Sequence, residues 1–430
     1  MKTIRVAALQ LAAHNRRDFA DAWAHIVPIV EKAAQNARLV VLPEGTAPAY
    51  ILGDQTDDGT ATMQALADLG KIAQSTGATI VVGAVRHDGP NAYNSAYVLD
   101  NDGTLAGVAD KFTLWHFDQR WFTRGEQIEP ISTSIGSLGV MVCADGRVPA
   151  IARRLVARGA QILIMPTAWV TSGRDDQVLE NLQADLLAQT RARENAVPFV
   201  AANKCGTEAR LAKYCGKSQI IDHRGTRLAM ASQNDPQTLY ADVTLAPMHH
   251  QPTRAFPVRD AEGISSYAPF RLAVHLGDQN DLGIACAMVD ADACVSTLHV
   301  PAERNPRLRI RLVEIDDAIA QDPLGLVAHR LAGTTLAIWR SEATERDIAI
   351  AIARSRAAEL RMYVVLLWKN QRGWIIDPNG TIVCGADAEN PIAVANLTPE
   401  TSCSGMVVPH TDVLNELARV IALDDGDTLP

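Results

Sequence analysis

Short apolar, β-branched runs alternate with segments of helical period through the first half of the chain. Ile4–Leu11 is predicted to be a strand, and Asp18–Asn36 carries apolar side chains on one side at helical spacing. The same alternation recurs. Further strands are predicted at Leu39–Pro43, Thr79–Gly83, Asn94–Asp100, Leu138–Val142, Gln161–Pro166, Phe199–Asn203, Ser218–Asp222 and Thr238–Val243, and further helices at Ala61–Ser75, Pro149–Arg158 and Leu179–Asn195. Buried strands under covering helices give this pattern, so an α/β fold is predicted.

The strands and helices group into two βαβα halves with added hairpins. One hairpin turn is Asn101-Asp102-Gly103-Thr104, since Asp-Gly supplies the positive φ that such turns require. This grouping predicts an α-β-β-α sandwich. A single doubly wound sheet is the alternative that composition alone leaves open.

Residues 246–307 have little periodicity and several prolines, which places a domain junction in this stretch. We therefore predict a catalytic domain over residues 1–268 and a C-terminal α/β domain over 269–430. The second domain contains a weak internal echo: Ile375–Thr381 parallels Ile220–Thr226, and Arg356–Glu359 parallels Arg191–Glu194. Because Ile375–Thr381 also fits Val98–Thr104, a degenerate partial repeat and a chance match both stay open.

Composition narrows the classes of function. The 430-residue chain has 47% hydrophobic residues, enough for a buried core, and its 40 Lys and Arg against 49 Asp and Glu give a net charge of −9. This balance, with no basic run, disfavours a nucleic-acid partner. No apolar stretch approaches the roughly 18 to 20 residues that span a bilayer, and the N-terminus turns polar too soon for a signal peptide. A cytoplasmic location without membrane partners is expected.

The seven cysteines are odd in number and lack a Cys-x-x-Cys pair, which argues against a disulfide framework or a zinc site. We expect reduced thiols. One of them, Cys143, follows the predicted strand Leu138–Val142, while Glu44 follows Leu39–Pro43 and Lys111 follows a predicted hairpin strand. Reactive groups of α/β folds commonly lie at such strand ends, because the strand fixes their position and the loop leaves them open.

These three residue types suit acyl transfer. A cysteine attacks as thiolate, so either a nearby cation must favour that form or a base must take the proton during attack. A carboxylate can be that base, and a lysine ammonium with the N–H that follows the cysteine can receive the charge that develops on the carbonyl oxygen. Taken alone, each has a simpler explanation: Cys143 as a buried apolar residue, Glu44 as a cap of a turn, Lys111 as a surface charge.

Several motifs in order resemble the nitrilase superfamily of carbon-nitrogen hydrolases, over about residues 3–268. The similar segments are Leu42-Pro43-Glu44, Asp110-Lys111 with Trp115 and Phe117, Gly139–Pro149 around Cys143, Arg158–Leu163 with Pro166–Trp169, Arg193–Asn195, Asn203–Gly206, and Val258–Asp260 with Tyr267. The resemblance implies the α-β-β-α sandwich, a thioester on Cys143 and water activated through Glu44, with no metal or organic cofactor. It also implies dimers or larger assemblies.

One departure concerns a second glutamate that amidases of this family carry. Its position falls on Asp118 here, whose side chain is shorter by one methylene, so its orienting role either stays with Asp118 or passes to Glu126. Cys143-Ala144-Asp145 also lacks the Cys-Trp-Glu sequence of true nitrile hydrolysers. Expected substrate contacts are Tyr50, Trp115, Ala144 and Trp169.

The resemblance favours hydrolysis of an amide or carbamoyl amide of a small substrate, with release of ammonia or an amine. Nitrile hydrolysis is one alternative, and a non-catalytic binding protein is another. The expected partner is the small-molecule amide alone, in a homo-oligomer or in an intrachain pseudo-dimer made through the C-terminal domain, which lacks its own Glu, Lys and Cys set.

Overall fold

The structure is a computed structural model that describes residues 2–53, 58–175, 177–248, 270–276, 282–288, 312–369, 372–387, 389–390, 392–397 and 404–425. The chain divides into two compact units, Met1–Thr253 and Arg254–Pro430. The domain boundary expected between residues 268 and 269 lies outside the described residues. Val258–Asp260 and Tyr267 lie outside them as well. That boundary stays a prediction.

The first unit contains two sheets. One has the order β11-β10-β1-β2-β3-β4-β5, with β14 paired to β1, and the other has the order β13-β12-β9-β8-β7-β6. The first sheet consists of β1 (Thr3–Ala12), β2 (Leu39–Val41), β3 (Thr79–Asp88), β4 (Asn91–Leu99), β5 (Leu105–Asp110), β10 (Lys204–Glu208), β11 (Ala212–Cys215) and β14 (Gln237–Thr244). The second consists of β6 (Ile131–Thr133), β7 (Gly136–Val140), β8 (Ile162–Pro166), β9 (Phe199–Ala202), β12 (Gln219–Ile221) and β13 (Arg227–Met230).

Both sheets repeat one pairing scheme: three parallel strands followed by an antiparallel hairpin. In the first sheet β1, β2 and β3 are parallel and β4 and β5 follow antiparallel, and β7, β8, β9, β12 and β13 do the same in the second. The sheets face each other through β2, β3, β8 and β9. Two sheets therefore form the core, and a single doubly wound sheet is excluded.

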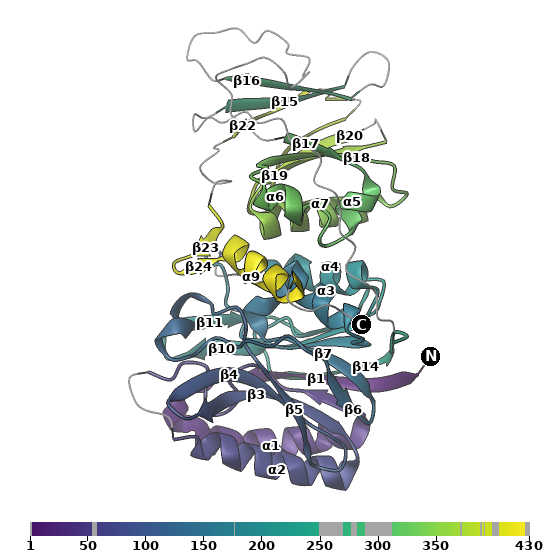
Figure 1. Ribbon diagram of the computed structural model, residues 1–430. Coiled ribbons are helices and arrows are strands. Elements are labelled where there is room, and N and C mark those ends of the chain that lie inside the picture. The colour runs from purple at the N-terminus through teal and green to yellow at the C-terminus, as the bar shows by residue number, and fades with distance from the viewer. Residues whose placement is uncertain are drawn as a thin grey trace. The chain divides into compact units, whose positions relative to one another are not determined.

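Helices cover the outer face of each sheet. They are α1 (Phe19–Asn36), α2 (Thr60–Thr76), α3 (Pro149–Ala157) and α4 (Ala188–Asn195). Short helical turns also occur at Arg16–Asp18, His116–Arg120, Cys143–Arg147 and Gln183–Leu187. Figure 1 shows α1 and α2 on one side of the two sheets and α3 and α4 on the other. This is the α-β-β-α sandwich. The apolar stripe of α1, with Trp23, Ile26 and Val30, packs into one buried cluster with Leu9 and Val40 of the sheet.

The structure differs from the sequence prediction at the fourth helix. The segment expected to be helical from Leu179 starts with a π-helical turn at Gln183–Leu187 and continues as α4. The Asn181 side chain explains the late start, because its oxygen accepts hydrogen bonds from the Gln183 and Ala184 N–H groups (2.9 and 3.2 Å) and so caps the helix. The β10–β11 hairpin was not predicted.

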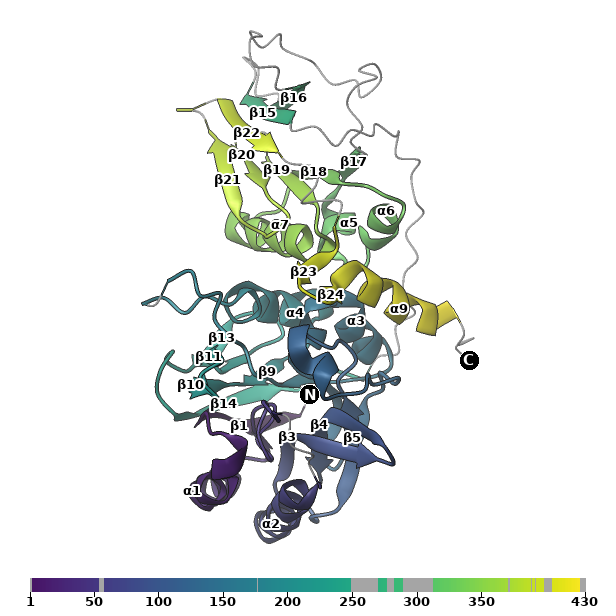
Figure 2. The same ribbon diagram turned by 90° about the vertical axis from the view of Figure 1, so that its left-hand side faces the viewer.

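The described part of the second unit contains one sheet of order β17-β18-β19-β20-β21, a smaller sheet of order β16-β15-β22 and a two-stranded sheet of β23 and β24. Its strands are β15 (Phe270–Leu276), β16 (Leu282–Met288), β17 (Leu312–Ile315), β18 (Leu336–Ser341), β19 (Tyr363–Trp368), β20 (Arg372–Ile376), β21 (Ile382–Ala386), β22 (Ile392–Leu397), β23 (Met406–Val408) and β24 (Thr411–Asp412). Its helices are α5 (Asp317–Gln321), α6 (Val327–Leu331), α7 (Arg346–Leu360) and α9 (Val413–Asp425). Helices α5 and α7 contact the larger sheet, and β15 and β22 contact its β20 and β21 strands (Figure 2).

Candidate active site

Cys143 is the first residue of the 3₁₀ turn Cys143–Arg147, which begins three residues after the end of β7. Its backbone has φ of 45°, a left-handed conformation that costs free energy for a residue with a side chain. The Asp145 carboxylate holds the turn, because its oxygens accept hydrogen bonds from the N–H groups of Val142 (2.9 Å) and Thr113 (2.7 Å). At Gly146 an added Cβ would lie 2.7 Å from the Gln183 Oε1 atom, so the backbone passes where a side chain does not fit. The turn is thus fixed on both sides of the thiol.

Three charged side chains with no exposed surface meet beside this turn. The Lys111 Nζ atom lies 2.7 Å from Glu44 Oε1 and 2.7 Å from Asp118 Oδ2. Each comes from a different part of the chain: Glu44 from the segment after β2, Lys111 from the end of β5, and Asp118 from the 3₁₀ turn His116–Arg120. One ammonium between two carboxylates leaves the cluster with a net charge of −1.

Neighbouring polar groups fix the orientation of both carboxylates. Asn94 donates to Glu44 Oε1 at 2.7 Å, while Asp118 accepts from the Tyr50 hydroxyl at 2.8 Å and from the Trp115 N–H at 2.8 Å. In contrast, Glu44 Oε2 is buried and makes no hydrogen bond within the described part of the chain. Glu44 therefore has one oxygen held in place and one oxygen available for a proton.

The electrostatics keep Lys111 charged. Burial lowers the pKa of its ammonium, but the charges of Asp118 and Glu44 outweigh that effect and the pKa is raised well above its ordinary value. Burial and the same two carboxylates raise the pKa of the Tyr50 hydroxyl, which stays a neutral donor to Asp118. The fixed cation and the neutral donor have the protonation states that the hydrogen bonds require.

Cys143 is close enough to this cluster for its charges to act on the thiol. Burial raises the pKa of the thiol, the negative charge of Glu44 raises it further, and Lys111, the Thr167 hydroxyl and the Ala168 N–H act in the opposite direction. The net shift is upward. Of the two ways to activate the thiol, the structure favours a base that takes the proton during attack over a thiolate that exists beforehand.

The structure shows which acid pairs with Lys111. Asp118 is fully buried and reaches the ammonium despite its shorter side chain, because the 3₁₀ turn brings its backbone close. Glu126 is exposed. The position that the sequence left open between these two residues is occupied by Asp118.

Of the residues expected to contact the substrate, Tyr50, Ala144 and Trp169 are buried. Tyr50 packs against Phe117, and Trp115 lies under the Arg147 guanidinium at 4.6 Å from its ring centre. Ala144 directly follows the thiol and is buried. Trp169 is 1% exposed, and its indole N–H makes no hydrogen bond among the described residues.

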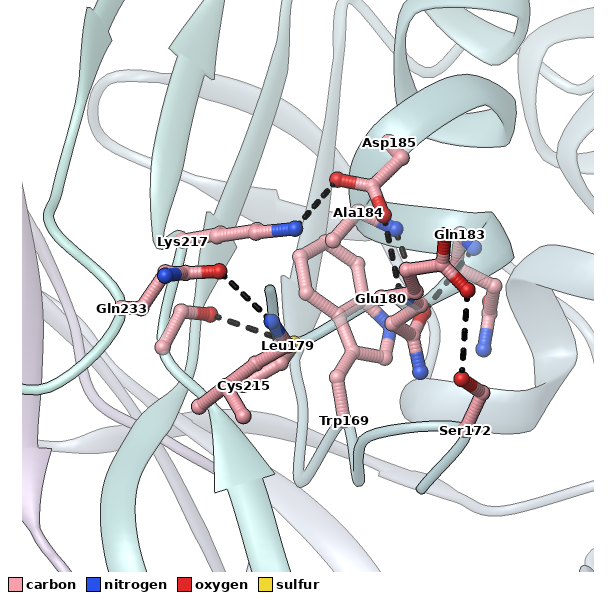
Figure 3. A network of polar contacts seen from close by, with 12 residues as sticks. Trp169, Ser172, Leu179, Glu180, Gln183, Ala184, Asp185, Cys215, Lys217 and Gln233 are labelled. Atoms are coloured by element: carbon pink, nitrogen blue, oxygen red, sulfur yellow. Dashed lines mark hydrogen bonds and ion pairs between the residues drawn. The ribbon is translucent and has the colours of Figure 1, made fainter. Parts of the chain in front are cut away.

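A polar network surrounds Trp169 (Figure 3). Lys217 pairs with Asp185 at 2.6 Å, and the Leu179 N–H donates to the Gln233 side chain at 2.8 Å. These contacts connect the segment before α4 to residues that follow β11 and β13. The Trp169 backbone is held by Asn203, whose side-chain oxygen accepts from its N–H at 2.8 Å, and by the Cys215 N–H, which donates to its carbonyl at 2.9 Å.

Sequence reasoning missed a second buried ion pair next to the site. Lys204 and Glu208 of β10 are 2.8 Å apart, and the Tyr214 hydroxyl donates to the same Glu208 oxygen at 2.8 Å. Lys204 also donates to the Gly45 carbonyl (2.8 Å), and the other Glu208 oxygen accepts from the Ile51 N–H (2.6 Å). We call this pair the Lys204–Glu208 clamp, since it holds both ends of the segment between Glu44 and Tyr50. Asn94 was missed as well.

Within the described ranges, no three His, Cys, Asp or Glu side chains are grouped as ligands of a metal ion would be. None of the described helices combines the length and the apolar character needed to cross a bilayer.

Several known proteins are similar to this chain in sequence or in structure. The sequence profile of the carbon-nitrogen hydrolase family matches residues 5–251. A probable nitrilase of Schizosaccharomyces pombe is 37% identical over 31% of this chain and 46% of its own length, and a citrullinase of Francisella tularensis is 27% identical over 58% and 92%. The crystal structure of a carbon-nitrogen hydrolase from Helicobacter pylori is similar with a TM-score of 0.50 at 27% identity, over 56% of this chain and 90% of that one. The chain belongs to the carbon-nitrogen hydrolase family.

Proposed function

We propose that the protein hydrolyses a linear amide or carbamoyl amide of a small substrate through a thioester on Cys143. One observation carries the proposal: a thiol on a turn of fixed geometry lies within the field of a carboxylate that has one unpaired oxygen and of a buried ammonium. The three groups come from separate parts of the chain. Packing them together without exposure costs desolvation free energy, and catalysis is a physical reason to retain them.

In the first step the Cys143 sulfur attacks the amide carbon while its proton passes to Glu44 Oε2. The carbonyl oxygen becomes an oxyanion, which the Lys111 ammonium and the Ala144 N–H stabilise. Glu44 then gives the proton to the departing nitrogen as the carbon-nitrogen bond breaks. Ammonia or an amine leaves, and the acyl group stays on the sulfur.

In the second step water attacks the thioester carbon and Glu44 takes its proton. The carbon-sulfur bond breaks, the acid is released, and the thiol recovers its proton. Asp118 does not touch the reacting atoms in this scheme. It positions Lys111, and Tyr50 and the Trp115 N–H position Asp118 in turn.

The substrate class rests on the character of the site and on relatives. The named relative citrullinase acts, by its name, on citrulline, whose reactive group is a carbamoyl amide. A carbamoyl amide presents the same carbon, oxygen and nitrogen to the three groups as a simple amide does. We place both within the proposed class.

The test measures ammonia release from a panel of simple amides, carbamoyl amines and nitriles. We expect turnover of at least one amide or carbamoyl amine, and its loss in C143A and in E44Q. C384A is the matched control, because Cys384 is a half-buried thiol of the second unit. Native turnover in C143A would overturn the mechanism, turnover of nitriles alone would overturn the substrate class, and no turnover across the panel would favour a binding protein.

A further inference from the structure

The second unit repeats the strand pairing of the half of the first unit that carries Cys143. β17, β18 and β19 are parallel and β20 and β21 follow antiparallel, as in β7, β8, β9, β12 and β13. The hairpins share a register shift at the same place, between Ile220 and Ile221 in one and between Ile375 and Ile376 in the other. The topology alone also fits β1–β5, so side-chain contacts must decide between the two.

A buried ion pair on the covering helix shows which half of the first unit the second unit matches. Arg191 and Glu194 pair on α4, and the Arg191 Nε atom donates to the Gly146 carbonyl at 3.0 Å. Arg356 and Glu359 pair in the same way on α7, and Arg356 Nε donates to the Ala320 carbonyl at 3.0 Å. The corresponding positions of α2 are Ile72 and Ser75, which carry no such pair. The second unit therefore matches the Cys143 half.

Strand register extends this match to the site itself. Gly139, Leu163 and Phe199 pair across β7, β8 and β9, and Val313, Ala337 and Val364 pair across β17, β18 and β19. Followed to the strand ends, this register places Asp317 at the position of Cys143, Ser341 at Thr167 and Glu342 at Ala168. The contact of Arg356 with Ala320 agrees, since Ala320 then corresponds to Gly146.

The matched position in the second unit holds an anion. Asp317 accepts a hydrogen bond from the Ser341 hydroxyl at 2.7 Å and from the Glu342 N–H at 3.0 Å. Trp339 adds a third donor at 2.9 Å. A hydroxyl and the next N–H along the chain thus bind a negative charge at this place in the fold.

The first unit has the same two donors at the matched positions. The strand register places the Thr167 hydroxyl and the Ala168 N–H where Ser341 and Glu342 bind Asp317, and both act to lower the pKa of the Cys143 thiol. Thr167 is fully buried, and its hydroxyl makes no hydrogen bond among the described residues. A buried hydroxyl without a partner costs free energy, and it has a reason to be retained if it donates to the sulfur once the sulfur is charged.

We propose that the Thr167 hydroxyl and the Ala168 N–H form an anion site that stabilises the Cys143 sulfur as it loses its proton, and that Asp317 fills the matching site of the second unit. The inference deepens the proposed function and rests on it for its catalytic meaning. When Glu44 takes the thiol proton, the new negative charge on sulfur is shared among Lys111 and these two donors. Thr167 is then a further catalytic residue, whose hydroxyl donates to the reacting sulfur once that sulfur is charged.

The first test is the rate at which iodoacetamide alkylates Cys143 between pH 6 and 10, followed on the Cys143 peptide by mass spectrometry. The thiolate displaces iodide, so the rate reports the charged form. We expect T167V to lower this rate roughly ten- to hundredfold near neutral pH, the range of a hydrogen bond to a charged group, and T167S to restore most of it. Circular dichroism checks that the variants are folded. An unchanged rate profile in T167V overturns the proposal.

The second test uses the matching site, where neither Glu44 nor Lys111 has a counterpart in the proposal. In full-length protein with C143A, D317C places a thiol beside Ser341 and the Glu342 N–H. We expect this thiol to be alkylated at least tenfold faster at neutral pH than in D317C with S341A, and equal rates would count against the anion site. Neither rate depends on amide turnover, so failure here and failure of the proposed hydrolysis are separate results.

Discussion

Removal of one partner of the Lys204–Glu208 clamp should lower the stability of the first unit by an amount that follows from the burial of the pair. Lys204 and Glu208 are 1% and 0% exposed, so removing one partner leaves the other charge buried and unpaired. Such a loss costs about 3 to 5 kcal/mol of stability, whereas removal of both charges avoids that penalty. We expect K204M and E208Q each to destabilise the first unit by about that amount.

The double variant K204M/E208Q should then lose less stability than the sum of the two losses by at least about 3 kcal/mol, the penalty of one unpaired buried charge. The first unit carries Cys215, which is buried, and burial raises the pKa of its thiol to about 12. Reaction of Cys215 with a thiol reagent across a urea series therefore measures unfolding of this unit.

The same variants test whether the clamp positions the catalytic segment. It holds the Gly45 carbonyl and the Ile51 N–H, next to Glu44 and Tyr50. A shift of about 1 Å in a reacting group lowers rates by about 10²-fold, so the double variant should lose kcat on this scale with little change in KM, even though it folds. Additive stability losses together with native kcat in the double variant would refute the reasoning.

Three further predictions concern the charged cluster and its turn. K111M leaves the carboxylates of Glu44 and Asp118 without a cation, and we expect kcat/KM to fall by about 10²- to 10³-fold, so native turnover would contradict the role of Lys111. D118N should lower kcat by about tenfold or more through a misplaced Lys111 while KM changes little, with partial recovery in D118E; a change in KM alone would point to substrate contact instead. Burial raises the pKa of Asp145 to about 6, so its contribution to stability is complete below about pH 4, its ordinary range, and is lost as the pH rises through 6. The urea midpoint of the first unit should fall over that interval, and a flat profile would show that Asp145 ionises as in the unfolded chain.

Much of the fold, and the candidate residues Glu44, Lys111 and Cys143, could be predicted because short-range sequence patterns indicate them. A strand end followed by a polar residue is a short-range pattern, and Glu44, Lys111 and Cys143 each show it. The two-sheet sandwich followed from the resemblance, and the structure confirms it. Asp118 could be placed by spacing, but only the 3₁₀ turn explains how a shorter acid reaches Lys111.

The Lys204–Glu208 clamp could not be predicted, because its burial and its partners depend on contacts between residues that are far apart in the chain. Lys204 and Glu208 lie on a short polar hairpin strand, a pattern typical of exposed loops. Their burial becomes evident only once β10 is paired with β1 and the Gly45–Ile51 segment covers it. The role of Asn94 could not be predicted for the same reason, since its side chain holds one oxygen of Glu44, a residue far away in the chain.

The sequence left open whether the second unit repeats part of the first, and in which register. Ile375–Thr381 fits both halves of the first unit because both halves end in the same kind of hairpin. The contacts of Arg356 with Glu359 and Ala320 remove that ambiguity. In this register Asp317 matches Cys143, so the second unit has a carboxylate where the first has a thiol. The sequence similarity is therefore weak around Cys143.

The most direct test of the central claim is to find the acyl group itself. The protein is mixed with an amide that it turns over, quenched with acid within milliseconds, digested and analysed by mass spectrometry. We predict an adduct with the mass of the substrate acyl group on the peptide that contains Cys143, formed at least as fast as ammonia is released. Steady release of ammonia with no adduct on that peptide would contradict the claim that Glu44, Lys111 and Cys143 act together on one carbonyl carbon.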